Sequence, residues 1–134
     1  MKLPIVILLS GNGSNLQKLI DASTADLPIR ICAVISNNPN AYGLERARKA
    51  GIRALVVDHR SYDDRPAFEC ALQKAVDVFT PRLLVLAGFM RILGAEFVRH
   101  YPLRLINIHP SLLPRFRGLH THERALSGGV STHG

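Results

Sequence analysis

Five short runs, each made mostly of apolar residues, divide this chain. They cover residues 4–9, 29–35, 54–57, 83–87 and 103–108. The runs are rich in Ile, Val and Leu and do not alternate with polar residues, which is typical of strands buried on both faces of a parallel sheet.

Helical patterns occupy most of the intervals between these runs. We expect helices over residues 16–22, 42–50, 66–79 and 94–100, a further helix over 121–126, and a loop over 127–134. Pro66 suits the first turn of the third helix, and Gly51 suits the C′ position that ends the second. The third helix carries an apolar stripe, formed by Phe68, Leu72, Ala75, Val76 and Phe79.

The alternation of strands and helices predicts an α/β fold with one open, mostly parallel, Rossmann-like sheet. Right-handed crossovers restrict the topology of such a sheet, and its commonest arrangement has the strand order 3-2-1-4-5. Ligands bind such sheets at the carboxyl ends of the strands, next to the point where the strand order reverses. That rule brings together the loops at residues 11–15, 88–93 and 107–114.

Composition narrows the class of protein. The 134 residues are 47% hydrophobic, which suits one domain with a real core, and they contain no apolar run long enough to span a membrane. We expect no signal peptide, and we expect Cys32 and Cys70 to be buried thiols of a cytoplasmic protein. The net charge of +7 fits a solvated basic surface, an anionic small-molecule substrate or nucleic acid. The basic residues form no block, and that disfavours nucleic acid.

The glycine-rich stretch at residues 11–15 follows a predicted strand and opens a predicted helix. Free N–H groups at such a helix start favour a phosphate. The dinucleotide fingerprint is absent because Leu16 stands near the position of its third glycine. We therefore favour a monophosphate site over a tight turn that binds nothing.

Residues 88–93 place apolar side chains around Arg91. Periodicity alone favours packing of a helix start for Met90, Ile92 and Leu93. In a cleft, the same residues would form a slot for a flat heterocycle, and main-chain groups would hydrogen-bond to the edge of the heterocycle.

Asn107 and His109 lie two residues apart, so they face the same way in an extended chain. An Asn amide can stabilise an oxyanion, and a His can carry a proton near neutral pH. The alternative is a strand-end His that bonds a backbone carbonyl. His120 and His122 lack a third ligand, so we expect capping by Thr121 and surface histidines, and no metal.

Several motifs together resemble the phosphoribosylglycinamide formyltransferase (GAR transformylase) family along the whole chain. They are residues 10–17, 43–47, 86–93, 107–114 and 118–122. The motif at 107–114 is shared with a wider group that includes methionyl-tRNA formyltransferase and formyltetrahydrofolate hydrolase. The glycine-rich stretch discriminates better, because it looks like the family's phosphate-binding loop.

The resemblance implies an enzyme of de novo purine biosynthesis. It would transfer a formyl group from 10-formyltetrahydrofolate, its co-substrate, to the amine of glycinamide ribonucleotide. The implied partners are these small molecules, with no nucleic acid, no membrane and a possible homodimer. The implied phosphate ligands are Gly13, Ser14, Asn15, Leu16 and Gln17. The implied folate contacts are Arg65, Met90, Arg91, Ile92, Leu93 and Asn107, and the implied catalytic residues are Asn107 and His109.

The family's domain continues beyond the length of this chain and supplies an Asp that pairs with the catalytic His. Asp58 and Glu123 lie in the wrong segments to replace that Asp. We therefore expect residues 1–134 to form a single formyltransferase-like domain that lacks the family's C-terminal portion and is poorly active alone. The alternatives are another formyl-folate enzyme, namely methionyl-tRNA formyltransferase or formyltetrahydrofolate hydrolase, or an inactive phosphate-binding fragment.

Overall fold

The structure, a computed structural model, describes residues 2–108. His109, the remainder of the 107–114 motif and the expected helix over 121–126 lie outside the described residues. The described elements, in chain order, are β1 (Leu3–Leu9), α1 (Ser14–Ala25), β2 (Ile29–Ser36), α2 (Tyr42–Lys49), β3 (Arg53–Val56), the short 3-10 helix η1 (His59–Ser61), α3 (Arg65–Asp77), β4 (Leu83–Ala87), α4 (Ala95–His100) and β5 (Leu105–Ile108).

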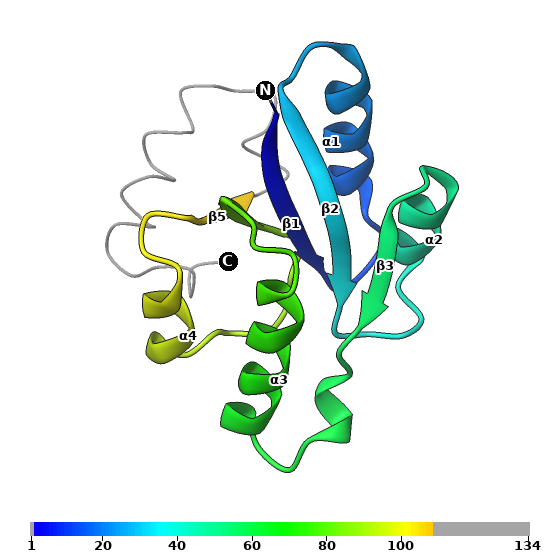
Figure 1. Cartoon of the computed structure of the whole chain (residues 1–134). Coiled ribbons are helices and arrows are strands. Elements are labelled where there is room, and N and C mark those ends of the chain that lie inside the picture. The colour runs from blue at the N-terminus through cyan, green and yellow to red at the C-terminus, as the bar shows by residue number, and fades with distance from the viewer. Residues whose placement is uncertain (1, 109–134) are drawn as a thin grey trace.

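The five strands form one parallel sheet in the order β3-β2-β1-β4-β5, which confirms the predicted topology. In Figure 1, α1 and α2 lie on one side of the sheet, and α3 and α4 lie on the other. β1 is the middle strand, and residues 5–9 are almost completely buried. Continuous apolar strands are what a sheet covered on both faces requires.

Each face of the sheet has its own core. On one face, Ile5 and Ile7 pack with Leu16 of α1 and Leu44 of α2. On the other face, residues of β1, β2 and β4 pack with the predicted stripe of α3 and with the aromatic residues of α4 and its C-cap. The buried side chains of that second group are Phe68, Leu72, Val76, Phe97 and Tyr101. Burying a large apolar side chain contributes about 1.5–3 kcal/mol, so the two cores hold the sheet between its helices.

Local signals set the helix ends. The Asp64 side chain accepts a hydrogen bond from the Ala67 amide (2.9 Å), so it caps α3, which has Pro66 in its first turn. Gly51 follows α2 with a left-handed backbone (φ 74°), as predicted. α1 begins at Ser14, two residues before the predicted start. Gly13 is its N-cap, and the first intrahelical bond runs from the Gln17 amide to the Gly13 carbonyl (2.9 Å).

Three expectations were wrong in detail. The fifth strand begins at Leu105, because Leu103 adopts φ 58° in an exposed turn closed by a bond from the Arg104 amide to the Tyr101 carbonyl (3.1 Å). Cys70 is exposed and Cys32 is half-buried, and both are free thiols. Cys70 points away from the sheet because it falls between the stripe positions Phe68 and Leu72.

Among residues 2–108, no helix has the length and apolar character needed to cross a membrane.

Candidate functional site

The carboxyl ends of β1, β4 and β5 lie side by side. Leu8 of β1 is in register with Leu86 of β4, and Leu86 is in register with Asn107 of β5. The loop after β1, the segment after β4 and Asn107 therefore share one edge of the sheet, and the segment after β4 lies between the other two. The predicted convergence is present for the part of the chain that the structure describes.

The glycine loop, defined as residues 11–15, turns sharply and lies directly against α2. Gly13 has a left-handed backbone (φ 81°), and the Gly43 amide donates to the Gly11 carbonyl (3.0 Å). A Cβ atom at Gly13 would lie 2.6 Å from the Cα atom of Gly43, and a Cβ atom at Gly43 would lie 2.5 Å from Leu9. This packing leaves no room for a side chain at either glycine.

Arg46 of α2 holds the glycine loop from the side. Its Nε donates to the Asn12 carbonyl (2.8 Å), its Nη2 donates to Asn12 Oδ1 (2.7 Å), and its Nη1 donates to Gln17 Oε1 (3.4 Å). Its guanidinium also lies over the Tyr42 ring, 5.0 Å from the ring centre. The sequence interpretation did not include Arg46 among the site residues, although it belongs to the quoted motif at 43–47.

The first turn of α1 combines main-chain donors with an unusual buried amide. The side chain of Asn15 is 4% exposed, and its Oδ1 atom is buried without a hydrogen-bond partner among residues 2–108. Leu16 is fully buried in the core, so only its main chain faces the loop. Ser14 is exposed. An unpaired polar atom in a native interior commonly marks a functional constraint, because leaving it unpaired costs about 1–3 kcal/mol.

The segment after β4, residues 88–93, has buried side chains near its two ends and exposed side chains between them. Phe89 and Leu93 are buried in the core, whereas Met90 is 79% exposed and Ile92 is 59% exposed. The packing interpretation is therefore right for Leu93 and wrong for Met90 and Ile92. Gly88 makes the turn into this segment with φ 76°.

Both ends of the 88–93 segment are fixed by hydrogen bonds. At the start, the Ser10 amide donates to the Gly88 carbonyl (3.1 Å), and the Met90 amide donates to Ser10 Oγ (2.8 Å). At the end, the Gly94 amide donates to Glu69 Oε2 (2.9 Å). Between these points, the amides of residues 91–93 form no hydrogen bond within residues 2–108.

Arg65 is linked to the 88–93 segment through the carboxylate of Glu69. Its Nε lies 3.5 Å from Oε2 of Glu69, the same oxygen that receives the Gly94 amide. Arg65 is exposed and Glu69 is buried. Arg65 and Glu69 line a cleft of about 490 Å³ between α3 and the N-terminal end of α4. Sequence reasoning missed Glu69, whose partner lies twenty-five positions further along the chain.

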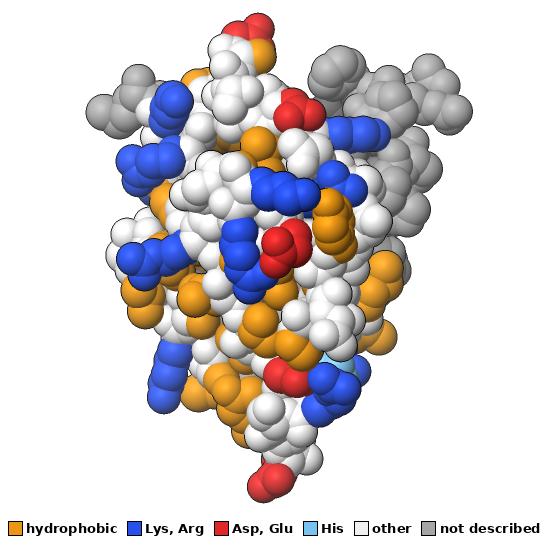
Figure 2. Space-filling view, turned by 90° about the vertical axis from the view of Figure 1, so that its right-hand side faces the viewer, with side chains coloured by type: hydrophobic (Ala, Val, Ile, Leu, Met, Phe, Trp, Pro, Cys, Tyr) orange, Lys and Arg blue, Asp and Glu red, His pale blue; other side chains and the backbone are white. Residues whose placement is uncertain are grey.

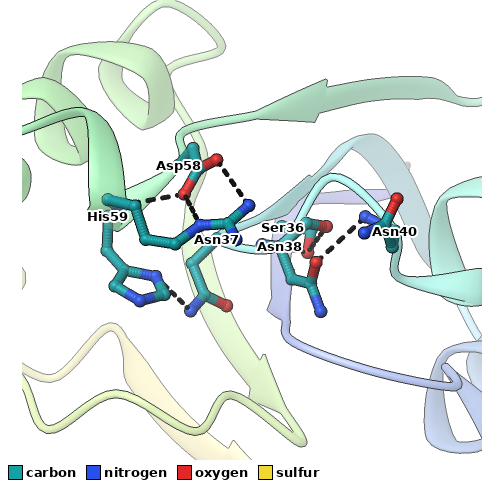
Figure 3. A network of polar contacts seen from close by, with 7 residues as sticks. Ser36, Asn37, Asn38, Asn40, Asp58 and His59 are labelled. Carbon is teal, nitrogen blue, oxygen red and sulfur yellow. Dashed lines mark hydrogen bonds and ion pairs between the residues drawn. The ribbon is translucent and has the colours of Figure 1, made fainter.

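Asn107 is buried (8% exposed) near the end of β5. On the far side of β1 and β4 from Asn107, along the same edge of the sheet, a polar network joins the ends of β2 and β3 (Figure 3). Its members are Ser36, Asn37, Asn38, Asn40, Asp58, His59 and Arg60. The Arg60 side chain hydrogen-bonds the Asp58 carboxylate and lowers the pKa of Asp58. Sequence reasoning did not anticipate this network.

A larger cleft of about 1130 Å³ lies between α1 and α2, mostly towards the opposite edge of the sheet. Gln17 and Arg46 line its end nearest the glycine loop, and Lys2, Arg30 and Lys49 line the remainder together with two acids. Figure 2 shows basic side chains in separate groups on this side of the molecule, with acidic and apolar surface between them. Within residues 2–108, no three His, Cys, Asp or Glu side chains are grouped to hold a metal.

Known proteins share this sequence and this arrangement. The chain is 52% identical over 131 residues to the phosphoribosylglycinamide formyltransferase of Escherichia coli K12, which covers 97% of the chain and 62% of that protein. It is 42% identical to the human trifunctional purine biosynthetic protein adenosine-3 over 99% of the chain and 13% of that protein. The chain thus spans less than two thirds of the length of these relatives.

Solved structures agree with the sequence matches. The phosphoribosylglycinamide formyltransferase of Coxiella burnetii, solved in complex with CHES, superposes with a TM-score of 0.81 at 56% identity, over 96% of this chain and 61% of that one. The enzyme of the same name from Brucella melitensis gives 0.79 at 44% identity, over 97% and 68%. The resemblance seen in the sequence is confirmed. Since the formyl transferase family profile also matches residues 3–134, the chain belongs to the formyl transferase family.

Proposed function

We propose that this chain carries the substrate-binding edge of a phosphoribosylglycinamide formyltransferase. The reaction is transfer of a formyl group from 10-formyltetrahydrofolate to the amine of glycinamide ribonucleotide. The observation that carries the proposal is the adjacency of β1, β4 and β5. It brings a loop suited to phosphate, an exposed apolar segment and a buried amide to one edge, which are the groups that a phosphorylated amine, a flat folate and a formyl carbonyl require.

The glycine loop supports binding of the ribonucleotide phosphate. The first N–H groups of α1, a helix of 12 residues, have no intrahelical acceptor, and the helix dipole favours an anion there. The absence of a side chain at Gly13 lets the loop pack directly against Gly43 of α2, which fixes the loop in the conformation that begins the helix. Ser14, Asn15 and Gln17 add side-chain donors, whereas Leu16 contributes its main-chain N–H because its side chain is in the core.

The 88–93 segment supports binding of the folate. The exposed side chains of Met90 and Ile92 offer apolar contact to a flat ring. The amides of Arg91, Ile92 and Leu93 form no hydrogen bond within residues 2–108, so they can donate hydrogen bonds to the polar edge of the ring. Arg65 is an exposed cation beside this segment and suits the carboxylates of a folate tail.

Asn107 supports the chemical step. The substrate amine attacks the formyl carbon, a carbon–nitrogen bond forms, and the carbonyl oxygen becomes an oxyanion that the Asn107 amide can stabilise. The bond from the formyl carbon to the folate nitrogen then breaks, and the amine proton passes to that nitrogen. We assign the proton transfer to His109, two residues further along the chain. A cytoplasmic location and a homodimer are further parts of this proposal, which fractionation and sedimentation test.

The test is a formyl-transfer assay on the gene product that carries residues 1–134, with both proposed substrates. Asn107→Ala should lower kcat by about 10²–10³-fold, the typical effect of removing an oxyanion donor, and leave the affinity for the ribonucleotide unchanged. The matched control is Asn40→Ala, which removes an exposed amide from the same edge of the sheet. Formyl transfer to methionyl-tRNA, or only hydrolysis of the formyl folate, would contradict the proposed substrate.

A further inference from the structure

Ser10, the residue that follows β1, contacts the 88–93 segment at two points. Its amide donates to the Gly88 carbonyl (3.1 Å), and its Oγ accepts from the Met90 amide (2.8 Å). The two bonds lie on either side of Phe89 and close the turn that Gly88 makes with its left-handed backbone. Ser10 therefore fixes the position of the main chain where it leaves β4.

Asn37 at the end of β2 fixes the Ser10 hydroxyl. The hydroxyl donates its proton to Asn37 Oδ1 (2.5 Å), so its oxygen lone pairs are directed towards the Met90 amide. Asn37 is itself held, because its Nδ2 donates to Nδ1 of His59 (3.2 Å), as Figure 3 shows. Asn37 is 4% exposed, so its own amide group is shielded from solvent.

The far end of the segment is fixed independently. Leu93 is buried in the core, and the Gly94 amide is bonded to Glu69. Residues 90–92 therefore project between two fixed ends with exposed side chains, and the amides of Arg91 and Ile92 form no hydrogen bond within residues 2–108. Ser10 is also joined through the backbone to Gly11, the first residue of the glycine loop, so it connects the two proposed substrate-binding segments.

We infer that Ser10 and Asn37 are positioning residues for the folate slot. They hold the main chain of residues 90–92 in the conformation that binds the flat ring, and they do so without contacting the substrate. This inference rests on the proposed function. The competing explanation is that both side chains only stabilise the end of the sheet.

Ser36 provides a matched control for that alternative. It is fully buried at the end of β2, and its hydroxyl donates to the Asn38 carbonyl (2.8 Å) and accepts from the Asn38 amide (2.9 Å). Ser36→Ala thus removes a buried hydroxyl with the same number of bonds from the same edge of the sheet. Its bonds close a local turn and do not reach the 88–93 segment.

The first measurement is hydrogen exchange of the protein without ligand. Ser10→Ala should raise the exchange rate of the Met90 amide by about tenfold or more, because that amide loses its acceptor. Ser36→Ala should leave the rate unchanged. Equal exchange at Met90 in the two variants would overturn the inference, whatever the protein binds.

The second measurement is steady-state kinetics with both substrates. Ser10→Ala should raise the KM for the folate about tenfold and change kcat and the KM for the ribonucleotide by less than about threefold. Asn37→Ala should raise the folate KM by about threefold, since it frees the Ser10 hydroxyl but leaves the Met90 contact. Ser10→Thr keeps the hydroxyl, so its folate KM should equal that of the parent protein. If Ser10→Ala does not fold, the comparison of Asn37→Ala with Ser10→Thr provides the test.

The outcomes separate the two proposals. A folate KM that stays unchanged in Ser10→Ala and Asn37→Ala, in an enzyme that transfers the formyl group normally, overturns the positioning role and leaves the proposed function intact. A parent protein that binds no folate overturns the proposed function, and the positioning role falls with it. Equal losses in Ser36→Ala and Ser10→Ala assign both hydroxyls to stability alone and overturn the inference.

Discussion

Gly13 and Gly43 meet so closely that neither position can hold a side chain. A Cβ atom at Gly13 would lie 2.6 Å from the Cα atom of Gly43, a separation that backbone atoms cannot accept without moving. The contact locks the glycine loop onto α2 before any ligand arrives. A preorganised loop loses less entropy on binding, so this contact should contribute to affinity as well as to stability.

Gly13→Ala should therefore damage both properties. A left-handed backbone costs an alanine about 1–2 kcal/mol, and the contact with Gly43 adds to that cost. We expect the free energy of unfolding, measured in urea, to fall by about 2–4 kcal/mol, and phosphate-ligand affinity to fall at least tenfold. The control is Gly51→Ala, which has φ 74° but no atom within 4 Å of the new Cβ. Equal effects of the two substitutions would show that the Gly43 contact is unimportant.

Arg46 should matter for ligand affinity more than its half-buried position on α2 suggests. Arg46→Met keeps the aliphatic stem but removes the bonds to Asn12 and Gln17, which loosens the glycine loop although the Gly43 amide still bonds the Gly11 carbonyl. We expect phosphate-ligand affinity to fall about tenfold in a calorimetric titration. Arg48→Met removes only an exposed pair with Glu45 and should change affinity less than twofold. Indistinguishable titrations would remove Arg46 from the site.

A substitution at Asn15 should affect the stability of the protein and its affinity for the ribonucleotide in different ways. Asn15→Leu replaces a buried amide, whose oxygen is unpaired among residues 2–108, with an apolar side chain of similar size. The free energy of unfolding should stay the same or rise by about 1 kcal/mol, whereas ribonucleotide affinity should fall about tenfold. Thermal unfolding and a binding titration on the same samples test both halves. A destabilised variant would mean that Asn15 has a structural partner.

The sequence predicted the sheet well because its signals are local and redundant. Residues 5–9 and 83–87 are continuously apolar, and only a doubly covered parallel sheet buries such strands on both faces. Given alternating helices, right-handed crossovers leave few strand orders. Leu103 was misassigned because an apolar residue beside a strand looks like part of it, whereas its left-handed turn depends on contacts with Tyr101 that periodicity does not encode.

The site was less predictable from the sequence. The glycine loop could be recognised because glycines after a strand have a specific use. Arg46, Glu69 and the Ser10–Asn37 contact were missed because each bond joins residues at least twenty-five positions apart. Such pairs become visible only when the sheet has brought the strand ends together. The role of a residue that bonds another residue's main chain leaves no pattern in its own neighbourhood.

Tyr101 should make the protein sensitive to alkali. Burial, and then a hydrogen bond to Asp77 (2.9 Å), raise the pKa of Tyr101 far above its ordinary value of 10.0. Above about pH 10 the unfolded chain releases the phenol proton and the folded chain keeps it, so the free energy of unfolding falls as pH rises, by up to about 1.4 kcal/mol per pH unit. Below about pH 10 this contribution is constant.

Tyr101→Phe should remove that part of the pH dependence. At neutral pH it should cost about 1 kcal/mol for the lost hydrogen bond, and between about pH 9.5 and 11 its stability should fall less steeply than that of the parent. Urea unfolding across this range measures the slope. Tyr62→Phe changes an exposed tyrosine and serves as the control. Parallel curves for parent and Tyr101→Phe would refute the assignment.

The position of β1 has a consequence for synthesis. β1 forms hydrogen bonds with β2 on one edge and with β4 on the other, yet β4 follows it by about 70 residues in the chain. At about 5–20 residues per second, a ribosome takes roughly 4–15 seconds to cover that distance. Throughout that interval the most apolar strand of the nascent chain has an unpaired edge. We expect chaperones to bind there, and translation pauses between residues 25 and 83 to lower the yield of folded protein.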